Sequence, residues 1–219
     1  MGKLKRIIQK YYYYTWASIF FQGFIDYLLV GPYFHLIKKT QITFIGQRPE
    51  LGKNYIVVSN HRSYNDPPLL GHAIHQPVSF IAKKELFKNP LLTLFMMLSS
   101  TISIDRTNAQ SETFSLARRA LNSKRILGKC WCVGMFIEGT RSKAEGMLGK
   151  PNKGVMLLAR MARVPIIPVG ISYRGDSEIV VKIGEPYEID YEADLIDEAW
   201  KCLEKIELLS DYKMPERVN

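Results

Sequence analysis

Short β-branched apolar runs alternate with longer apolar or amphipathic segments along most of this chain. The short runs predict buried strands and the longer segments predict helices. Strands are predicted at 41–45, 54–59, 77–83, 101–105, 130–137, 165–172 and 178–184, and helices at 66–75, 85–98, 107–121, 154–162 and 193–209. Strands that alternate with helices indicate an α/β fold, with a mostly parallel central sheet flanked by helices on both faces.

The N-terminal segment has a different pattern. Residues 11–30 contain a single charged side chain, Asp26, and as one helix they would extend about 30 Å, enough to cross a hydrocarbon core. Their polar residues nevertheless fall on one helical face: Thr15, Ser18, Gln22 and Asp26. A helix with such a stripe lies in a membrane interface or packs the stripe against a protein domain.

Basic residues flank this apolar stretch, with Lys3, Lys5, Arg6 and Lys10 before it and Lys38-Lys39 after it. Each basic residue adds roughly 1 kcal/mol of attraction near an anionic leaflet. We therefore expect residues 1–40 to form membrane-interface helices, interrupted at Gly31-Pro32, and residues 41–219 to form the α/β domain. A core helix of a soluble fold remains an alternative. A cleaved signal peptide is not expected, because no cleavage site of the A-x-A type follows the apolar stretch.

Composition narrows the set of partners. The 219 residues carry a net charge of +9, which favours an anionic partner such as a membrane, a phosphorylated substrate or nucleic acid. The basic residues flank apolar stretches and match no known nucleic-acid motif, so no nucleic acid is expected. Cys130, Cys132 and Cys202 make no disulfide framework or zinc-knuckle spacing, which indicates a reducing compartment and no metal.

Polar residues follow four of the predicted strands, where parallel sheets gather their functional loops. These residues are Asn60, His61 and Asp66; Lys83, Lys84 and Glu85; Asp105 and Arg106; and Glu138, Gly139, Thr140, Arg141 and Ser142. The set holds no thiol or activated serine that would serve as a nucleophile, and the chain has no glycine-rich phosphate loop.

His61 and Asp66 suggest a base that activates a substrate hydroxyl. Asp66 would accept a hydrogen bond from one ring nitrogen, and the other nitrogen would take the proton. The alternative is that Asp66 only caps the helix that begins with Pro67, while His61 is a polar loop residue.

The turn at Gly139-Thr140-Arg141 also allows two interpretations. Gly139 either makes a tight turn that leaves Arg141 in solvent, or it lets the backbone approach a ligand while the guanidinium binds a phosphate. Lys83 and Lys84 would by themselves be a solvated pair.

Four blocks in order resemble the motifs of the glycerolipid acyltransferase family, in particular the 1-acyl-glycerol-3-phosphate acyltransferases. They are NHRSYND at 60–66, ISIDR at 102–106, FIEGTRS at 136–142 and VPIIPVGI at 164–171, and AKKEL at 82–86 is also similar to the family. The resemblance covers about half the chain.

The resemblance implies transfer of a fatty acyl group from an acyl-CoA or acyl-ACP thioester to the sn-2 hydroxyl of lysophosphatidic acid, which gives phosphatidic acid. It implies His61 as general base with Asp66 as its partner, and no cofactor or metal. Glu138, Gly139 and Thr140 would contribute to acceptor binding, with Arg106 and Arg141 near the phosphate and Lys83 or Lys84 beside them.

These implications agree with a membrane-associated enzyme on the cytoplasmic face, with an anionic phospholipid membrane as its partner. An acyl chain needs an apolar groove, and Leu92, Phe95, Met96 and Met97 are candidates to line it. Two alternatives remain open: the same chemistry on glycerol 3-phosphate, a lyso-ornithine lipid or a lipid A precursor, and an inactive module that binds anionic lipid.

Overall fold

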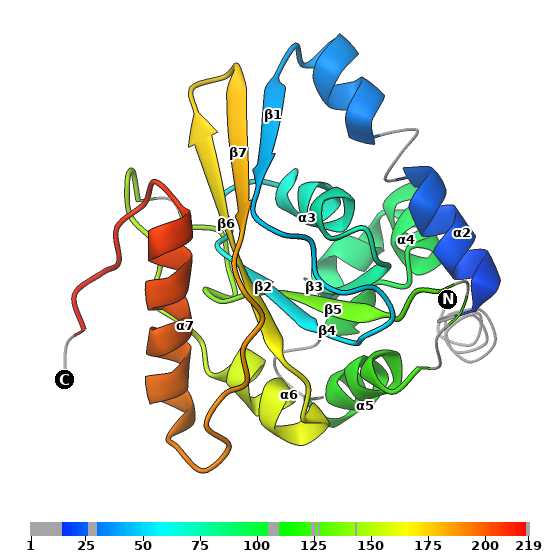
Figure 1. The fold of residues 1–219 in the computed structure, drawn as a ribbon. Coiled ribbons are helices and arrows are strands. Elements are labelled where there is room, and N and C mark those ends of the chain that lie inside the picture. The colour runs from blue at the N-terminus through cyan, green and yellow to red at the C-terminus, as the bar shows by residue number, and fades with distance from the viewer. Residues whose placement is uncertain are drawn as a thin grey trace.

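A computed structural model describes residues 15–25, 30–104, 110–123, 126, 128–142 and 144–217. Its centre is a seven-stranded sheet in the order β1-β7-β6-β2-β5-β3-β4 (Figure 1). The strands are β1 (Gln41–Ile45), β2 (Ile56–Ser59), β3 (Val78–Lys83), β4 (Ile102–Ile104), β5 (Cys132–Phe136), β6 (Ile166–Arg174) and β7 (Glu178–Ile183).

The sheet is mostly parallel, as predicted. β2 pairs in parallel with both β5 and β6, β3 pairs in parallel with β4 and β5, and β1 pairs in parallel with β7. Only the β6–β7 pair is antiparallel among these pairings, because a short turn connects the two strands directly. The carboxyl ends of β2, β5, β3 and β4 consequently lie along one edge of the sheet.

Helices cover both faces of the sheet, and alternate residues of β2 show the two layers. Ile56 and Val58 belong to the core beneath α5 (Gln110–Leu121), α6 (Gly154–Ala162) and α7 (Leu195–Leu209). Val57 faces the opposite core, which holds Leu69 and Leu70 of α3 (Asp66–Ile74). Figure 1 shows α5, α6 and α7 together on one side of the sheet and α3 on the other. This arrangement confirms the predicted fold class.

The single helix predicted at 85–98 is wrong. The chain instead forms a 3₁₀ segment, η3 (Lys84–Lys88), and then a separate helix, α4 (Pro90–Leu98). Asn89 separates them in an extended conformation, and its side chain accepts hydrogen bonds from the amides of Leu91 and Leu92. Asn89 is thus an N-cap and Pro90 the first helical residue, a combination that starts a new helix. The predicted cap of α5, at residues 107–108, lies outside the described residues.

In the N-terminal segment, α2 (Trp16–Phe24) and the π-helical turn η2 (Tyr33–Ile37) lie within the described residues. Ser18 is fully buried, and Gln22 donates from Nε2 to the carbonyl oxygen of Val78 at 3.0 Å. The polar stripe therefore packs against the sheet domain, one of the two predicted arrangements. Asp26, the fourth polar position, lies outside the described residues.

The N-terminal segment also contributes to the core. Ile25, Val30 and Phe34 are buried in the same apolar cluster as the residues of β2 and α3. The division into residues 1–40 and 41–219 stays a prediction. Among the described residues, no helix has both the length and the apolar character that crossing a bilayer requires.

Candidate active site

The loops that follow β2, β3 and β5 surround a cavity of about 460 Å³ at the carboxyl edge of the sheet, a common size for a small-molecule site. His61 follows β2, Lys83 ends β3, and Gly139, Thr140 and Arg141 follow β5. Ile104, the last residue of β4, also lines the cavity. The predicted convergence is therefore observed for the ends of β2, β3, β4 and β5, while Asp105 and Arg106 lie outside the described residues.

His61 and Asp66 form a hydrogen-bonded pair, with Nδ1 of the imidazole 2.8 Å from Oδ2 of the carboxylate. Asp66 is fully buried, and the same Oδ2 accepts from the backbone amides of Arg62 at 2.7 Å and Ser63 at 2.8 Å. The loop between the two residues turns back around the carboxylate. The expectation that Asp66 caps α3 is wrong, because Asp66 is the first helical residue and its carboxylate is directed to this loop.

The other carboxylate oxygen has a partner that the sequence did not suggest. Oδ1 of Asp66 accepts a hydrogen bond of 2.6 Å from the phenol of Tyr173, near the end of β6. Burial and the charge of Asp66 raise the pKa of the Tyr173 phenol. The phenol therefore stays a neutral donor.

The pairing also assigns the proton on the imidazole. An ionised carboxylate can only accept hydrogen bonds, so Nδ1 of His61 carries the proton and Nε2 holds the lone pair. The ring stacks on Phe136 with centroids 3.9 Å apart and an interplanar angle of 11°. Because His61 also lines the cavity, Nε2 is the atom that can take a proton from a ligand hydroxyl.

Glu138 fixes the backbone around His61. Its Oε1 accepts from the amide of His61 at 2.9 Å, and its Oε2 accepts from the amide of Gly149 at 2.8 Å. The side chain is buried, and this burial raises the pKa of the carboxyl group. Gly149 is required by the contact, since a Cβ there would lie 2.6 Å from Oε2 of Glu138. Both oxygens of Glu138 thus bind the protein itself, and Glu138 is not among the residues that line the cavity.

The other predicted ligand-binding residues have different positions. Lys83 lines the cavity and Lys84 does not, although both side chains are exposed. Gly139, Thr140 and Arg141 line it together, and Gly139 has a positive φ of 65° that favours glycine in this turn. Arg106 lies outside the described residues.

The predicted groove residues do not line this cavity. Met96 and Met97 pack with Phe87 in a small separate core, while Leu92 and Phe95 are exposed. The apolar wall comes from other elements: Phe80, Ile81, Ala82, Leu86, Ile104, Phe114, Met135, Phe136 and Val155. Five of these residues lie near the carboxyl ends of β3 and β5, which are adjacent strands. Apolar residues at the ends of the predicted strands were therefore the signal in the sequence that could have indicated this wall.

Asn60 joins the loop before His61 to the sheet. Its fully buried side chain donates to the carbonyl oxygen of Ile171 and accepts from the amide of the same residue, each at 2.9 Å. Ser142 donates from its amide to the carbonyl oxygen of His61 at 2.9 Å. The backbone on both sides of the imidazole is therefore held by hydrogen bonds.

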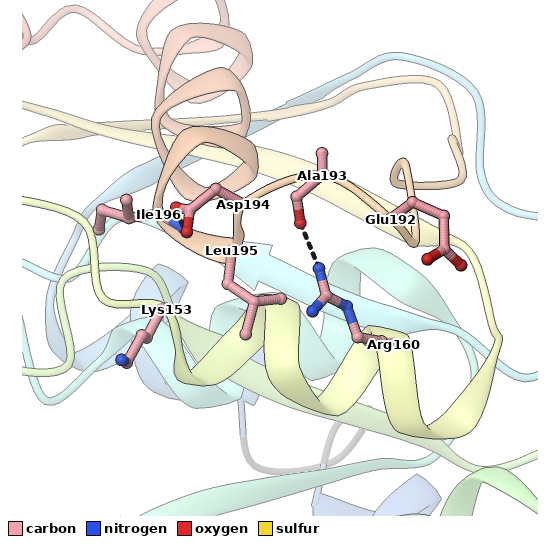
Figure 2. Close-up of a pocket in the computed structure, with 7 residues that line it drawn as sticks. All are labelled: Lys153, Arg160, Glu192, Ala193, Asp194, Leu195 and Ile196. Atoms are coloured by element: carbon pink, nitrogen blue, oxygen red, sulfur yellow. Dashed lines mark hydrogen bonds between the residues drawn. The ribbon is translucent and has the colours of Figure 1, made fainter.

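A second hollow, of about 390 Å³, lies between α6 and the segment before α7 (Figure 2). Lys153 and Arg160 come from the α6 side, and the guanidinium of Arg160 donates to the carbonyl oxygen of Ala193. Glu192 and Asp194 also line it, so the hollow has charges of both signs. None of the residues of the His61 cavity lines it.

The structure thus combines a mostly parallel α/β fold with a hydrogen-bonded His–Asp pair beside a cavity that has an apolar wall. The family model Acyltransferase matches residues 37–172, and the chain belongs to this family. The match covers the His–Asp loop, the cavity loops after β3 and β5, and most of β6.

Two curated relatives and one solved structure are similar to the chain. It is 32% identical over 155 residues to the 1-acyl-sn-glycerol-3-phosphate acyltransferase of Saccharomyces cerevisiae, covering 69% of this chain and 50% of the relative. It is 32% identical over 130 residues to the enzyme of the same name from Salmonella typhimurium, covering 58% and 51%. The chain spans about half the length of these relatives.

The structural comparison shows the fold. The crystal structure of the 1-acyl-sn-glycerophosphate (LPA) acyltransferase PlsC from Thermotoga maritima superposes with a TM-score of 0.61 at 22% identity, covering 95% of each chain.

Proposed function

We propose that this protein transfers a fatty acyl group from an acyl-CoA or acyl-ACP thioester to the sn-2 hydroxyl of 1-acylglycerol 3-phosphate, giving phosphatidic acid. The observation that carries the proposal is the His61–Asp66 pair beside a cavity with an apolar wall. The names of the relatives support the acceptor. The exposed cations Lys83 and Arg141 on the cavity lining suit a phosphate, and the apolar residues suit an acyl chain.

The proposed reaction needs one base and no covalent enzyme intermediate. Nε2 of His61 takes the hydroxyl proton as the acceptor oxygen attacks the thioester carbonyl carbon, and Asp66 stabilises the imidazolium. The tetrahedral intermediate then collapses with cleavage of the carbon–sulfur bond. The departing thiolate takes the proton from the imidazolium, so the products are the new ester and a free thiol.

The activity is tested with the purified chain in phospholipid vesicles, using 1-acylglycerol 3-phosphate with either acyl-CoA or acyl-ACP. We expect phosphatidic acid and one equivalent of free thiol from at least one donor. Glycerol 3-phosphate and a lyso-ornithine lipid serve as competing acceptors in the same assay. Faster turnover of one of these would replace the proposed acceptor, and failure with every acceptor would favour a lipid-binding module without activity.

We also propose that the protein works on the surface of an anionic membrane, at the cytoplasmic leaflet. The support is the outer side of α2, where Phe20 is 73% exposed and Phe24 is also exposed, while Ser18 and Gln22 are buried. A helix that exposes its apolar side chains to water loses the free energy of burying them, whereas a bilayer restores it.

Helix α4 extends the same apolar surface. Leu91 is 79% exposed, and Leu94 and Phe95 are exposed beside it. Phe95 meets Phe21 of α2 edge to face with centroids 6.3 Å apart, so the exposed faces of the two helices adjoin. The segment before α4 lines the cavity through Lys83, Glu85 and Leu86, so this exposed apolar surface adjoins the proposed site, which supports the proposal.

Point substitutions test this attachment better than removal of residues 1–40, because Ile25, Val30 and Phe34 belong to the core. Phe20→Ser and Leu91→Ser should each weaken sedimentation with anionic vesicles. Leu208→Ser on α7 is the matched control, since Leu208 is 82% exposed on the opposite side of the sheet from α3. Equal loss in all three variants, or in none, would contradict the proposed surface.

A further inference from the structure

Asp66 is held by two kinds of donor that reach its two oxygens from different parts of the chain. The loop amides of Arg62 and Ser63 and the imidazole of His61 all bind Oδ2. Oδ1 is bound by the Tyr173 hydroxyl, which lies 107 positions further along the chain. The local loop therefore supplies every donor to one oxygen and β6 supplies the donor to the other.

We propose that Tyr173 is a positioning residue for the reaction, which orients the Asp66 carboxylate so that Oδ2 stays aligned with Nδ1 of His61. The inference rests on the proposed general-base function of His61 and adds a residue to it.

The geometry gives the physical reason. A carboxylate rotates about the bond that carries it, and its torsion has a broad minimum. Rotation about this bond moves both oxygens together, so donors that hold both oxygens restrict it more than donors that hold one oxygen alone. A phenol at 2.6 Å on Oδ1 fixes the second point and thereby the plane of the group.

Burial makes this contact important. Asp66 is fully buried, so without the Tyr173 phenol no solvent water could donate a hydrogen bond to Oδ1 unless the site rearranged. The alignment of the carboxylate has its largest effect when His61 becomes an imidazolium, since the Nδ1–Oδ2 hydrogen bond is then charge-assisted and strongest. Loss of the phenol should therefore slow the chemical step more than it changes substrate binding.

Tyr173 itself is well fixed. Its backbone amide donates to the phenol of Tyr212 at 3.1 Å, and Tyr212 is buried. Tyr212 therefore contacts Tyr173 without touching Asp66, so removal of its hydroxyl is a matched control. A residue that only supported the packing of β6 would give similar results at both positions.

The test compares Tyr173→Phe with Tyr212→Phe in the full chain, after circular dichroism has shown that both variants are folded at the assay temperature. For Tyr173→Phe we expect kcat to fall about tenfold with KM for the acceptor within about twofold, the size of effect that a hydrogen bond to a charged group gives. Tyr212→Phe should keep kcat near the wild-type value. Unchanged kcat in Tyr173→Phe, or equal loss in both variants, would overturn the inference.

A second measurement separates this inference from the proposed function. Diethyl pyrocarbonate modifies the free nitrogen of an imidazole, and peptide mass spectrometry follows His61 among the four histidines of the chain. Slower modification of His61 in Tyr173→Phe than in wild type would support the positioning role even if no acyl transfer were found. An equal rate in both proteins would overturn that role, while absence of transfer by wild type would overturn only the proposed function.

Discussion

The guanidinium of Arg141 lies over the ring of Tyr64, with its central carbon 3.8 Å from the ring centroid, and donates from Nη2 to the phenol oxygen at 2.9 Å. Tyr64 belongs to the loop between His61 and Asp66, whereas Arg141 follows β5. Both residues line the cavity. The contact orders a long cationic side chain at the proposed site before any ligand binds, which reduces the entropy lost on binding.

We predict that Arg141 recognises the phosphate of the acceptor. Arg141→Lys keeps the charge but loses the planar fork that forms two parallel hydrogen bonds, so kcat/KM for 1-acylglycerol 3-phosphate should fall at least about tenfold. Arg141→Ala should lose more. Tyr64→Phe, which keeps the ring and removes only the phenol oxygen, is the milder control. Equal losses with an acceptor that lacks phosphate would show that Arg141 has another role.

The second prediction concerns the His–Asp pair. His61→Ala should lower kcat by about 10²–10⁴-fold, the usual contribution of a general base. Asp66→Asn should also be severe, because an amide in that position can favour the wrong tautomer of His61. Steady-state kinetics on folded variants measure both effects. Turnover close to the wild-type value in either variant would refute the assignment of this pair as the base.

Local spacing was enough to predict the central part of this site. His61 and Asp66 are five positions apart at a strand-to-helix connection, so the geometry of one loop brings them together. The parallel sheet was equally predictable, since β-branched runs alternate with helical segments. The break at Asn89-Pro90 was also visible in the sequence, as an N-cap followed by proline, but the continuous apolar pattern of 85–98 obscured it.

Contacts between distant segments were not predictable in the same way. Tyr173 reaches Asp66, and Gly149 reaches Glu138, only because the order of strands in the sheet places their elements beside the loop. A glutamate after a strand looks like a ligand-binding group whether it faces a cavity or a backbone amide. Only the packed structure distinguishes these two environments.

The third prediction follows from the position of Glu138. If its carboxylate holds the amides of His61 and Gly149, Glu138→Gln should lower kcat and the free energy of unfolding while KM for the acceptor changes little. Loss of one buried hydrogen bond to a charged group costs about 1.5–3 kcal/mol. Urea unfolding and steady-state kinetics measure the two effects.

Gly149→Ala provides an independent way to displace Glu138, because the added Cβ would collide with Oε2. It should reproduce the kinetic pattern of Glu138→Gln. A rise in KM for the acceptor with unchanged kcat, in Glu138→Gln, would instead support the acceptor-binding role that the sequence suggested.

The last prediction concerns stability in acid. Burial lowers the pKa of His75 from 6.5 to about 4, and the nearby cations Arg48 and Lys129, together with His72, act in the same direction. The folded protein thus binds the His75 proton less readily than the unfolded chain does. The contribution of His75 to stability is therefore lost as pH falls from about 6.5 through about 4.

His75→Asn removes this titration and suits the backbone, because His75 ends α3 with a φ of 58° and asparagine tolerates that region. Urea unfolding of both proteins at neutral pH and near pH 4.5 measures the difference. The wild type should lose more free energy of unfolding than the variant on acidification. Parallel losses in the two proteins would show that the acid sensitivity of the fold comes from other groups.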